Sequence, residues 1–335
     1  MLVLGLESSC DDCSAAVVEE SARGPQIISL IRKTQDHLHA PYGGVVPELA
    51  AREHLIQLRS VIQSALTQAN VKAADLERIA VTRGPGLIGC LLTTFSAAKA
   101  MAWYSKVPFI GVNHLLGHLN AARFAEPNLP FPALALLVSG GHTHLYLAES
   151  WVNLRLLMKT RDDAAGEAFD KTARILNLGY PGGPAVDERA KSAVELAPPF
   201  TPPKFKDGTP SWSFSGLKTA VKQRVESNPA LSKADESVGA LCKTVNETIT
   251  AWLLKPIPDF VGIHSAASLV VSGGVACNSE LRAGAARLGK KLGITVSIPE
   301  PRLCTDNGAM IASAGAILSA SAAPWTENAD ADLKL

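Results

Sequence analysis

The same order of strands and helices occurs twice along this chain, and this repeat constrains the fold more than any other feature. Three consecutive strand-like segments lie between residues 2 and 34, and alternating helical and strand-like segments follow them. After a Pro-rich stretch at residues 126–132, three strand-like segments return between residues 133 and 159. A plain doubly wound sheet would alternate from its first strand. We therefore predict an α/β protein of two duplicated lobes.

The length of 335 residues also fits two domains, because a single hydrophobic core rarely grows to this size. We expect a first lobe at residues 1–126, a second lobe with helical insertions at 127–320, and a tail at 321–335. The closing helix expected at 307–318 could pack back on the first lobe. A central cleft between two such lobes would collect strand ends and helix N-termini, which is where ligands bind in α/β folds.

The composition predicts a globular protein of a reducing compartment. Hydrophobic residues make up 47% of the chain and charged residues 19%, which argues against an intrinsically disordered chain. We find neither the long apolar run of a membrane span nor a basic leader with a cleavage site. Six cysteines in a chain of this length do not form a disulfide framework. We expect a cytoplasmic protein with no membrane partner.

The formal net charge of +1 is too small for a protein that holds nucleic acid on an extended basic surface. One basic stretch contains aromatic residues, as RNA-contacting segments do. Its members are Lys204, Phe205, Lys206, Trp212, Phe214, Lys218, Lys222 and Arg224. A solvated loop and helix surface explains this stretch more simply. An RNA substrate would therefore need partner proteins or a local contact.

The sequence Val-Ser-Gly-Gly follows a buried strand twice, at residues 138–141 and 271–274. Paired glycines let backbone N–H groups approach a phosphate, and the serine adds a donor. One such motif could equally be a tight turn, but two copies favour a nucleotide site. Asp170 and Asp187 flank a Pro-Gly-Gly-Pro loop and could bind ribose hydroxyls. Ordinary helix-surface charges would look the same.

His114 and His118 are four residues apart in a helical segment, so both imidazoles can reach one metal ion. A third ligand must come from elsewhere in the chain. Asp306, where a loop enters the last helix, is a candidate. The alternatives are a structural histidine pair and an N-cap aspartate.

Cys10 and Cys13 enclose the acidic pair Asp11-Asp12. A second Cys-x-x-Cys motif, which a zinc site would require, does not occur in the sequence. No helix opens at this pair to lower a thiol pKa, so a redox role has little support. The two carboxylates are the more interesting feature.

Motifs in order along nearly the whole chain resemble the TsaD (Gcp/YgjD) family. They begin with Gly-Leu-Glu-Ser-Ser-Cys-Asp at 5–11 and continue at 42–50, 84–87, 137–142, 162–172, 180–184, 214–219 and 304–309. The resemblance implies an actin-like, hexokinase-like two-lobe fold of the ASKHA, RNase H-like class. It also implies transfer of threonylcarbamoyl from threonylcarbamoyl-AMP to N6 of adenosine 37 in tRNAs that decode codons beginning with A, with release of AMP.

The resemblance further implies site residues and partners. His114, His118 and Asp306 would hold one divalent metal ion, usually iron(II), with zinc or magnesium in relatives. The adenylate site would be lined by Leu137, Val138, Ser139, Gly140, Gly141, Asp170, Gly183, Asp187 and Asn278. TsaB-like and TsaE-like companion proteins would assist on tRNA, and a TsaC-like synthase would supply threonylcarbamoyl-AMP.

Asp11 and Asp12 are candidates, by position, for the base that takes the proton of the attacking amine. The chain departs from the family here, because Glu-Thr usually stands where this chain has Asp12-Cys13, and His-His where it has Asn113-His114. A shorter side chain withdraws the carboxylate by roughly 1 Å, which weakens the case for Asp12 in direct catalysis. The insertion at 258–268 looks longer than usual, and we assign it no structure.

Three other functions are alternatives for a chain with such a fold. A fold alone does not distinguish an ATPase or sugar kinase from a transferase. A metallopeptidase would need His-Glu-x-x-His, which is absent from the sequence. A non-catalytic scaffold would not need three metal ligands.

Overall fold

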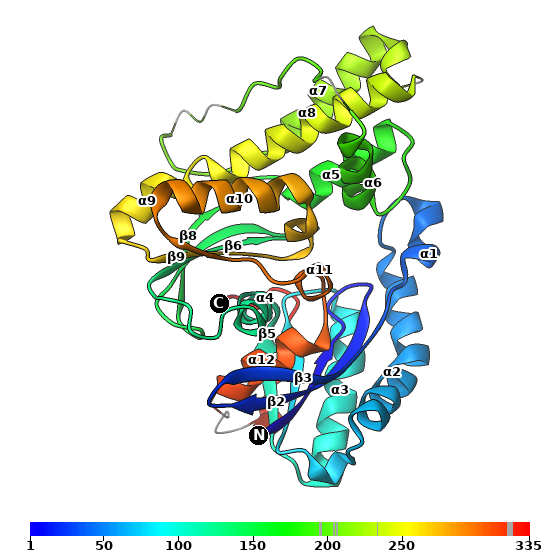
Figure 1. Ribbon diagram of the computed structural model, residues 1–335. Helices are drawn as coiled ribbons and strands as arrows, with labels where there is room; N and C mark the ends of the chain where they lie inside the picture. Colours follow the sequence, from blue (N-terminus) through cyan, green and yellow to red (C-terminus); the bar gives the residue numbers. More distant parts are fainter. Residues whose placement is uncertain (194–195, 204, 206, 233, 320–323) are drawn as a thin grey trace. The chain divides into compact units, whose positions relative to one another are not determined.

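The computed structural model describes the chain except residues 194–195, 204, 206, 233 and 320–323, and the chain forms two compact units (Figure 1). The first unit contains Met1–Leu129, Glu149–Leu154 and Arg302–Leu335. The second contains Pro130–Ala148 and Arg155–Pro301. Of the basic stretch, Lys204 and Lys206 lie outside the described residues.

The first unit is built on a five-stranded sheet in the order β3-β2-β1-β4-β5. The strands are β1 (Leu2–Glu7), β2 (Cys13–Ser21), β3 (Gly24–Lys33), β4 (Arg78–Gly84) and β5 (Phe109–Asn113). Strands β1, β2 and β3 form an antiparallel meander, and β4 and β5 add to β1 in parallel. The carboxyl ends of β1, β4 and β5 therefore lie at one edge of the sheet.

Helices cover both faces of this sheet. Leu4 and Leu6 of β1 share a core with α2 (Pro47–Ala69) and α3 (Ile88–Ser105). Side chains alternate along a strand, so Gly5 faces the opposite side, where α12 (Gly308–Ile317) packs. A Cβ at Gly5 would lie 2.1 Å from the carbonyl oxygen of Gly308. This close approach brings the residues just before α12 to the sheet edge.

The remaining helices of the first unit are short. They are α1 (Asp36–His39), η1 (Ala40–Tyr42), η2 (Ala73–Asp75), α4 (His114–Asn120), η3 (Ala121–Phe124), α11 (Pro301–Cys304), which begins at the last residue of the second unit, and η6 (Pro324–Thr326).

The second unit repeats the topology of the first. Its strands are β6 (Ala133–Val138), β7 (Thr143–Ala148), β8 (Leu154–Lys159), β9 (Ser268–Ser272) and β10 (Thr295–Ser297), in the order β10-β9-β6-β7-β8. As in the first unit, the second strand is antiparallel to the first, and the fourth is parallel to it. The predicted duplication is confirmed.

The helices of the second unit include one, α9 (Ile257–His264), in the insertion to which the sequence analysis assigned no structure. The helices are α5 (Ala165–Ile175), α6 (Gly182–Lys191), α7 (Ser215–Ser227), η4 (Pro229–Ser232), α8 (Asp235–Leu254), α9 (Ile257–His264), η5 (Gly274–Cys277) and α10 (Ser279–Leu292). Most of the unassigned insertion at 258–268 is α9. Its Pro258 lies in the first helical turn, where a missing N–H costs little.

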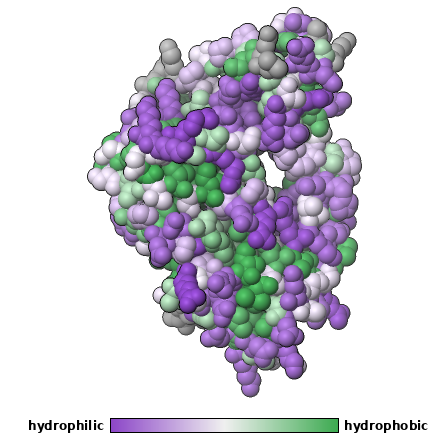
Figure 2. All heavy atoms as spheres, in the orientation of Figure 1, coloured by the Kyte–Doolittle hydropathy of each residue, from purple (hydrophilic) through white to green (hydrophobic). Residues whose placement is uncertain are grey.

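The visible surface is mixed, with hydrophilic side chains predominating and hydrophobic ones between them (Figure 2). Among the described residues, no helix combines the length and apolar character that crossing a membrane requires.

Candidate functional site

Two histidines are placed at the sheet edge of the first unit by the junction of β5 and α4. Strand β5 ends at Asn113, whose Oδ1 accepts hydrogen bonds from the N–H groups of Leu115 and Leu116. This cap starts α4 at His114, and one helical turn brings His118 beside it. The two imidazole centroids are 4.6 Å apart.

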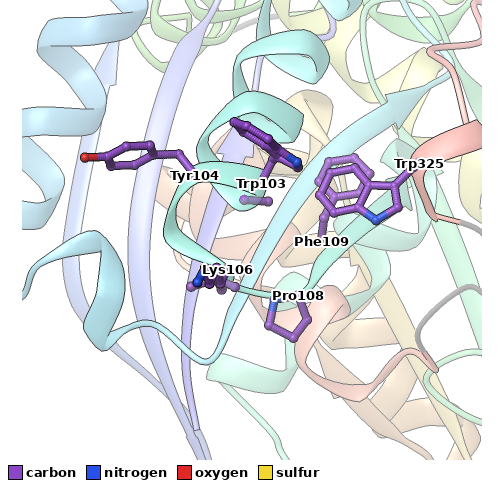
Figure 3. A pocket seen from close by; sticks show the side chains of 8 residues that line it. Trp103, Tyr104, Lys106, Pro108, Phe109 and Trp325 are labelled. Carbon is purple, nitrogen blue, oxygen red and sulfur yellow. The ribbon is translucent and has the colours of Figure 1, made fainter.

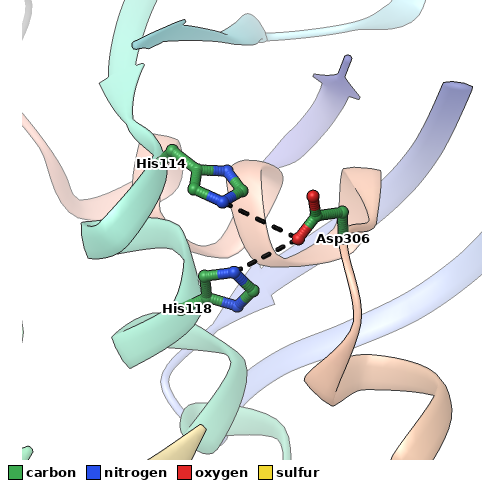
Figure 4. A group of neighbouring side chains, drawn as sticks. All are labelled: His114, His118 and Asp306. Carbon is green, nitrogen blue, oxygen red and sulfur yellow. Dashed lines mark ion pairs between the residues drawn. The ribbon is translucent and has the colours of Figure 1, made fainter. Parts of the chain in front are cut away.

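Asp306 approaches the histidines from a distant part of the chain (Figure 4). Its Oδ1 lies 3.2 Å from His118 Nε2 and 3.7 Å from His114 Nε2. Asn307, not Asp306, caps α12, because Asn307 Oδ1 accepts the N–H of Met310. The N-cap alternative for Asp306 is therefore wrong, and its carboxylate faces the imidazoles.

The three side chains fit a metal ion. One ligand atom from each lies within 4.8 Å of the others. Ligand atoms about 2.1 Å from a shared ion are separated by roughly 3–4 Å, which the measured contacts of Asp306 match. His118 is 1% exposed, its Nδ1 has no hydrogen-bond partner among the described residues, and its Nε2 faces Asp306 Oδ1 at 3.2 Å without hydrogen-bond geometry. A metal ion would satisfy such a buried nitrogen.

Glu7 orients His114 from behind. This fully buried carboxylate ends β1, and its Oε2 lies 3.1 Å from His114 Nδ1. The hydroxyl of Thr82 and the N–H of Ser9 donate to the same carboxylate. A carboxylate that accepts Nδ1–H fixes the ring with Nε2 forward, as around metal-bound histidines. We did not single out Glu7 from the sequence, although a carboxylate ending a buried strand signals a required partner.

Charges within this cluster reinforce one another. Burial by itself would raise the pKa of Glu7. The charge and hydrogen bond of His114 outweigh burial, so the pKa of Glu7 lies below its ordinary value. Burial lowers the pKa of His114, yet the charges of Glu7 and Asp306 raise it to about 9. Burial likewise raises the pKa of Asp306, and the two histidines bring it well below its ordinary value. Because a histidine ligand must be deprotonated, metal binding would displace a proton here.

Asp11 and Asp12 lie in the loop between β1 and β2. This loop adjoins the cluster, because Ser9 Oγ lies 3.2 Å from His114 Nδ1. Asp12 Oδ2 pairs with Arg32 Nη2 at 2.9 Å, while Asp12 Oδ1 is buried without a hydrogen-bond partner among the described residues. Burial, opposed in part by Arg32, raises the pKa of Asp12 to about 7. Burial also raises the pKa of Asp11.

In the second unit, the two glycine motifs lie side by side. They follow the parallel neighbours β6 and β9, and Gly273, with φ of 97°, packs against the backbone of Val138. An added Cβ at Gly140 or Gly141 would meet no described atom within 4 Å. The backbone at Gly140 and Gly141 is therefore open to solvent, whereas the Ser139 N–H donates to the carbonyl oxygen of His142 and the side chains of Leu137 and Val138 are buried in the core.

The other predicted adenylate residues lie in two groups. Asp170 Oδ1 accepts the N–H of Gly182 at 2.8 Å, which ties α5 to the start of α6 beside Gly183. Asp187 and Asn278 are joined through Asn246 of α8, whose Nδ2 donates to Asp187 and whose Oδ1 accepts from Asn278. Asn246 was not singled out from the sequence, since a lone asparagine inside a helix carries no motif.

A separate groove in the first unit has a different character (Figure 3). It is lined by Ala102, Trp103, Tyr104, Lys106, Val107, Pro108, Phe109 and Trp325. None of these residues is a histidine, cysteine or carboxylate. The groove therefore offers no imidazole, thiolate or carboxylate ligand for a metal ion.

Comparisons with known proteins show which family the chain resembles over most of its length. A family model described as tRNA N6-adenosine threonylcarbamoyltransferase (TsaD) matches residues 26–313. Enzymes of that name from Trichlorobacter lovleyi and Anaeromyxobacter dehalogenans strain 2CP-C are 46% and 47% identical to the chain. The first alignment covers 96% of this chain and 92% of its relative, and the second covers 98% of both.

Solved structures share the fold at low sequence identity. Component A of (R)-2-hydroxyglutaryl-CoA dehydratase from Acidaminococcus fermentans superimposes with a TM-score of 0.56 and 14% identity, over 94% of this chain and 97% of that one. HypF of T. kodakarensis gives a TM-score of 0.60 and 14% identity, over 94% of this chain and 47% of its own. These likenesses concern the fold alone, and they confirm the predicted actin-like class.

Proposed function

The chain belongs to the TsaD family of tRNA N6-adenosine threonylcarbamoyltransferases, and we propose that it transfers threonylcarbamoyl from threonylcarbamoyl-AMP to N6 of adenosine 37, with release of AMP. Its substrates would be tRNAs that decode codons beginning with A. The observation that carries this proposal is the convergence of His114, His118 and Asp306 in a chain that aligns with these transferases over nearly its whole length.

The three residues would hold one divalent metal ion. Two imidazoles and one carboxylate are the donor set of non-haem iron(II) sites, and zinc accepts the same donors. Magnesium prefers oxygen ligands, so iron(II) is the better match. When bound, the ion supplies Lewis-acid polarisation of a carbonyl or phosphate oxygen. Glu7 contributes by holding the His114 ring with Nε2 toward Asp306.

Asp12 is our candidate for the general base that takes the proton of the attacking amine. A base is most effective when its pKa lies near the operating pH, and burial brings the pKa of Asp12 to about 7. Its buried Oδ1, without a partner among the described residues, is the atom that would accept the proton. Asp11 remains a candidate by its position in the same loop.

The adenylate would bind in the second unit. Backbone N–H groups of Gly140 and Gly141 would take the phosphate, as in other glycine turns that follow buried strands. Ser139 would line the site from within the turn, because its N–H already donates to the carbonyl oxygen of His142. Leu137 and Val138 would act through the backbone, because their side chains are buried. Asp170, Gly183, Asp187 and Asn278 would bind the nucleoside, with the second aspartate positioned by Asn246.

Partners follow from the same reaction. A TsaC-like synthase would supply threonylcarbamoyl-AMP, and TsaB-like and TsaE-like companions would assist on tRNA. All of these reactants belong to the cytoplasm, where we expect the protein to act.

Reconstitution tests the proposal. The chain, the companions and the synthase are incubated with tRNA, threonine, bicarbonate and ATP, and tRNA nucleosides are analysed by mass spectrometry. We expect threonylcarbamoyladenosine with the native chain, and none with His118→Ala, which should also lose bound metal while its fold survives. His37→Ala, at an exposed position, is the matched control. Normal metal content and activity in His118→Ala would make the histidine pair structural.

Nucleotide binding separates this proposal from a kinase or ATPase. Isothermal titration with ATP, AMP and threonylcarbamoyl-AMP should show the tightest binding for threonylcarbamoyl-AMP. Tightest binding of ATP, with hydrolysis and no modified nucleoside, would favour the ATPase.

A further inference from the structure

Arg32 of β3 joins two loops that are far apart in the sequence. Its Nη2 lies 2.9 Å from Asp12 Oδ2, in the loop between β1 and β2. Its Nη1 donates to the hydroxyl of Thr305 at 2.6 Å, directly before Asp306. One guanidinium therefore connects the candidate base with the loop that carries the carboxylate of the metal cluster.

The two contacts use the geometry of the guanidinium group. Its N–H donors are held in a rigid plane, so one arginine can serve two acceptors in fixed directions. A lysine ammonium is a point charge on a flexible stem and lacks this fork. The side chains of Arg32 and Asp12 are 32% and 13% exposed, so their ion pair is partly withdrawn from water.

The backbone of the same loop is held separately. Asn307 Nδ2 donates to the carbonyl oxygens of Thr305 and Leu303. Thr305 is thus fixed by its carbonyl from one side and by its hydroxyl, through Arg32, from another. Because Asp306 is the next residue, its backbone position is restricted as well. Metal ligands must be held within about 0.5 Å of their productive positions, so such a restriction bears on affinity.

We propose that Arg32 is a positioning residue that fixes the Asp12 loop and the Thr305–Asp306 loop around the metal cluster, so that metal affinity depends on it although it touches no metal ligand. This inference rests on the proposed metal site of His114, His118 and Asp306.

The test is titration of the metal-free full chain with iron(II) under anaerobic conditions, with zinc as a second probe. Arg32→Leu should weaken metal binding by roughly tenfold, the lower end of what outer-shell substitutions cost. Thr305→Val is the milder second variant, and it should show a comparable loss. The double variant should lose no more than either single one, because both changes break the same connection.

Lys33→Leu is the matched control, since it removes the same charge from the neighbouring position of β3, where Lys33 contacts Ser60. Its metal affinity should equal that of the native chain. Arg32→Lys should recover only part of the loss, because one ammonium cannot reproduce the fork. Melting temperatures without metal should agree among all variants.

Several outcomes would overturn the inference. If Arg32→Leu binds metal as tightly as Lys33→Leu, or if the losses of Arg32→Leu and Thr305→Val add, Arg32 does not act through Thr305. If the native chain nevertheless binds metal and His118→Ala does not, the proposed metal site stands without the role of Arg32. If the native chain and His118→Ala both bind no metal, the site itself fails, and the inference fails with it.

Discussion

The buried carboxylate of Glu7 receives three hydrogen bonds, from His114, Thr82 and Ser9. A buried carboxylate is costly unless a partner offsets its charge, and His114 is that partner: its Nδ1–H donates to Glu7, as a neutral or a protonated ring. The same contact leaves only Nε2 of that ring to face Asp306. A residue that contacts neither metal nor substrate therefore decides which histidine nitrogen is available.

Glu7→Gln should lower metal affinity by roughly tenfold to a hundredfold, since the amide keeps the shape but cannot supply the charge that makes His114 a stronger ligand. Competition with a chelator measures this affinity. Glu77→Gln, which removes an exposed carboxylate contacting the N-terminal residue, serves as control. Equal affinities for the two variants would contradict the role of Glu7.

Asp12 makes stability depend on pH. Its ordinary pKa is 3.8, and burial raises the pKa in the folded chain to about 7. Between pH 3.8 and about 7 the folded state binds more protons at Asp12 than the unfolded state does. The contribution of Asp12 to the free energy of unfolding is therefore most favourable at low pH and is lost as the pH rises through this range. Asp12→Asn removes this dependence. Between pH 5 and 7 the variant should gain roughly 1–2 kcal/mol relative to the native chain. Urea unfolding at several pH values measures the difference, and parallel curves would refute it.

At the level of elements, the junction of β5 and α4 places the two histidines. Strand β5 passes directly into α4, and Asn113 at this point both caps the helix and donates its Nδ2 to the carbonyl oxygen of Leu333. The strand–helix order here was predictable from hydrophobic periodicity. Asparagine is a preferred N-cap residue, so the cap was also predictable, whereas the contact with Leu333 depends on folding.

Asn113→Ala should lower the free energy of unfolding by about 1 kcal/mol, the usual cost of losing an N-cap. Metal affinity should fall as well, because the first turn of α4 carries His114. Asn113→Asp retains a capping oxygen and should restore most of the stability. Urea unfolding of the metal-free chain is the measurement, and an alanine variant as stable as the native chain would show that the Asn113 cap contributes little.

The sequence predicted elements with a clear period and missed those without one. Helix α2 (Pro47–Ala69) was predictable, because its apolar positions recur at helical spacing. Helix α9 was missed, since Pro256 at its N-cap and Pro258 in its first turn disrupt the pattern. His114 and His118 were predictable as neighbours, whereas Glu7 and Asn246 acquire their roles only through folding. Spacing along one helix is local information, and contacts between elements are not.

For the molecule as a whole, the proposed metal site and the proposed adenylate site fall in different units of the duplicated fold. All three metal-cluster residues belong to the first unit, although Asp306 follows the second unit in the sequence. The predicted adenylate residues all belong to the second unit. The repeat of strands was visible in the sequence. From residue 302 onward the chain belongs to the first unit again, where α12 packs against β1 at Gly5.

The charge of the molecule leads to the last prediction, that companions are required for efficient modification. A net charge of +1 gives little long-range attraction for RNA. Within the basic stretch, Lys222 pairs with Glu226, and Arg224 stacks on Phe200 and donates to the carbonyl oxygen of Pro198. Both cations thus contact groups of this chain, which compete with RNA phosphates for them.

With the TsaC-like synthase alone, the chain should modify tRNA slowly, and addition of TsaB-like and TsaE-like companions should raise the rate by about tenfold or more. Filter binding of tRNA to the chain alone should be weak at physiological salt and should depend only shallowly on salt, since few phosphates are neutralised. Lys218→Ala should change this binding little, because a single phosphate contact contributes a small part of the affinity. Robust turnover with the synthase alone, together with tight and strongly salt-dependent tRNA binding, would show instead that the chain carries a sufficient RNA surface of its own.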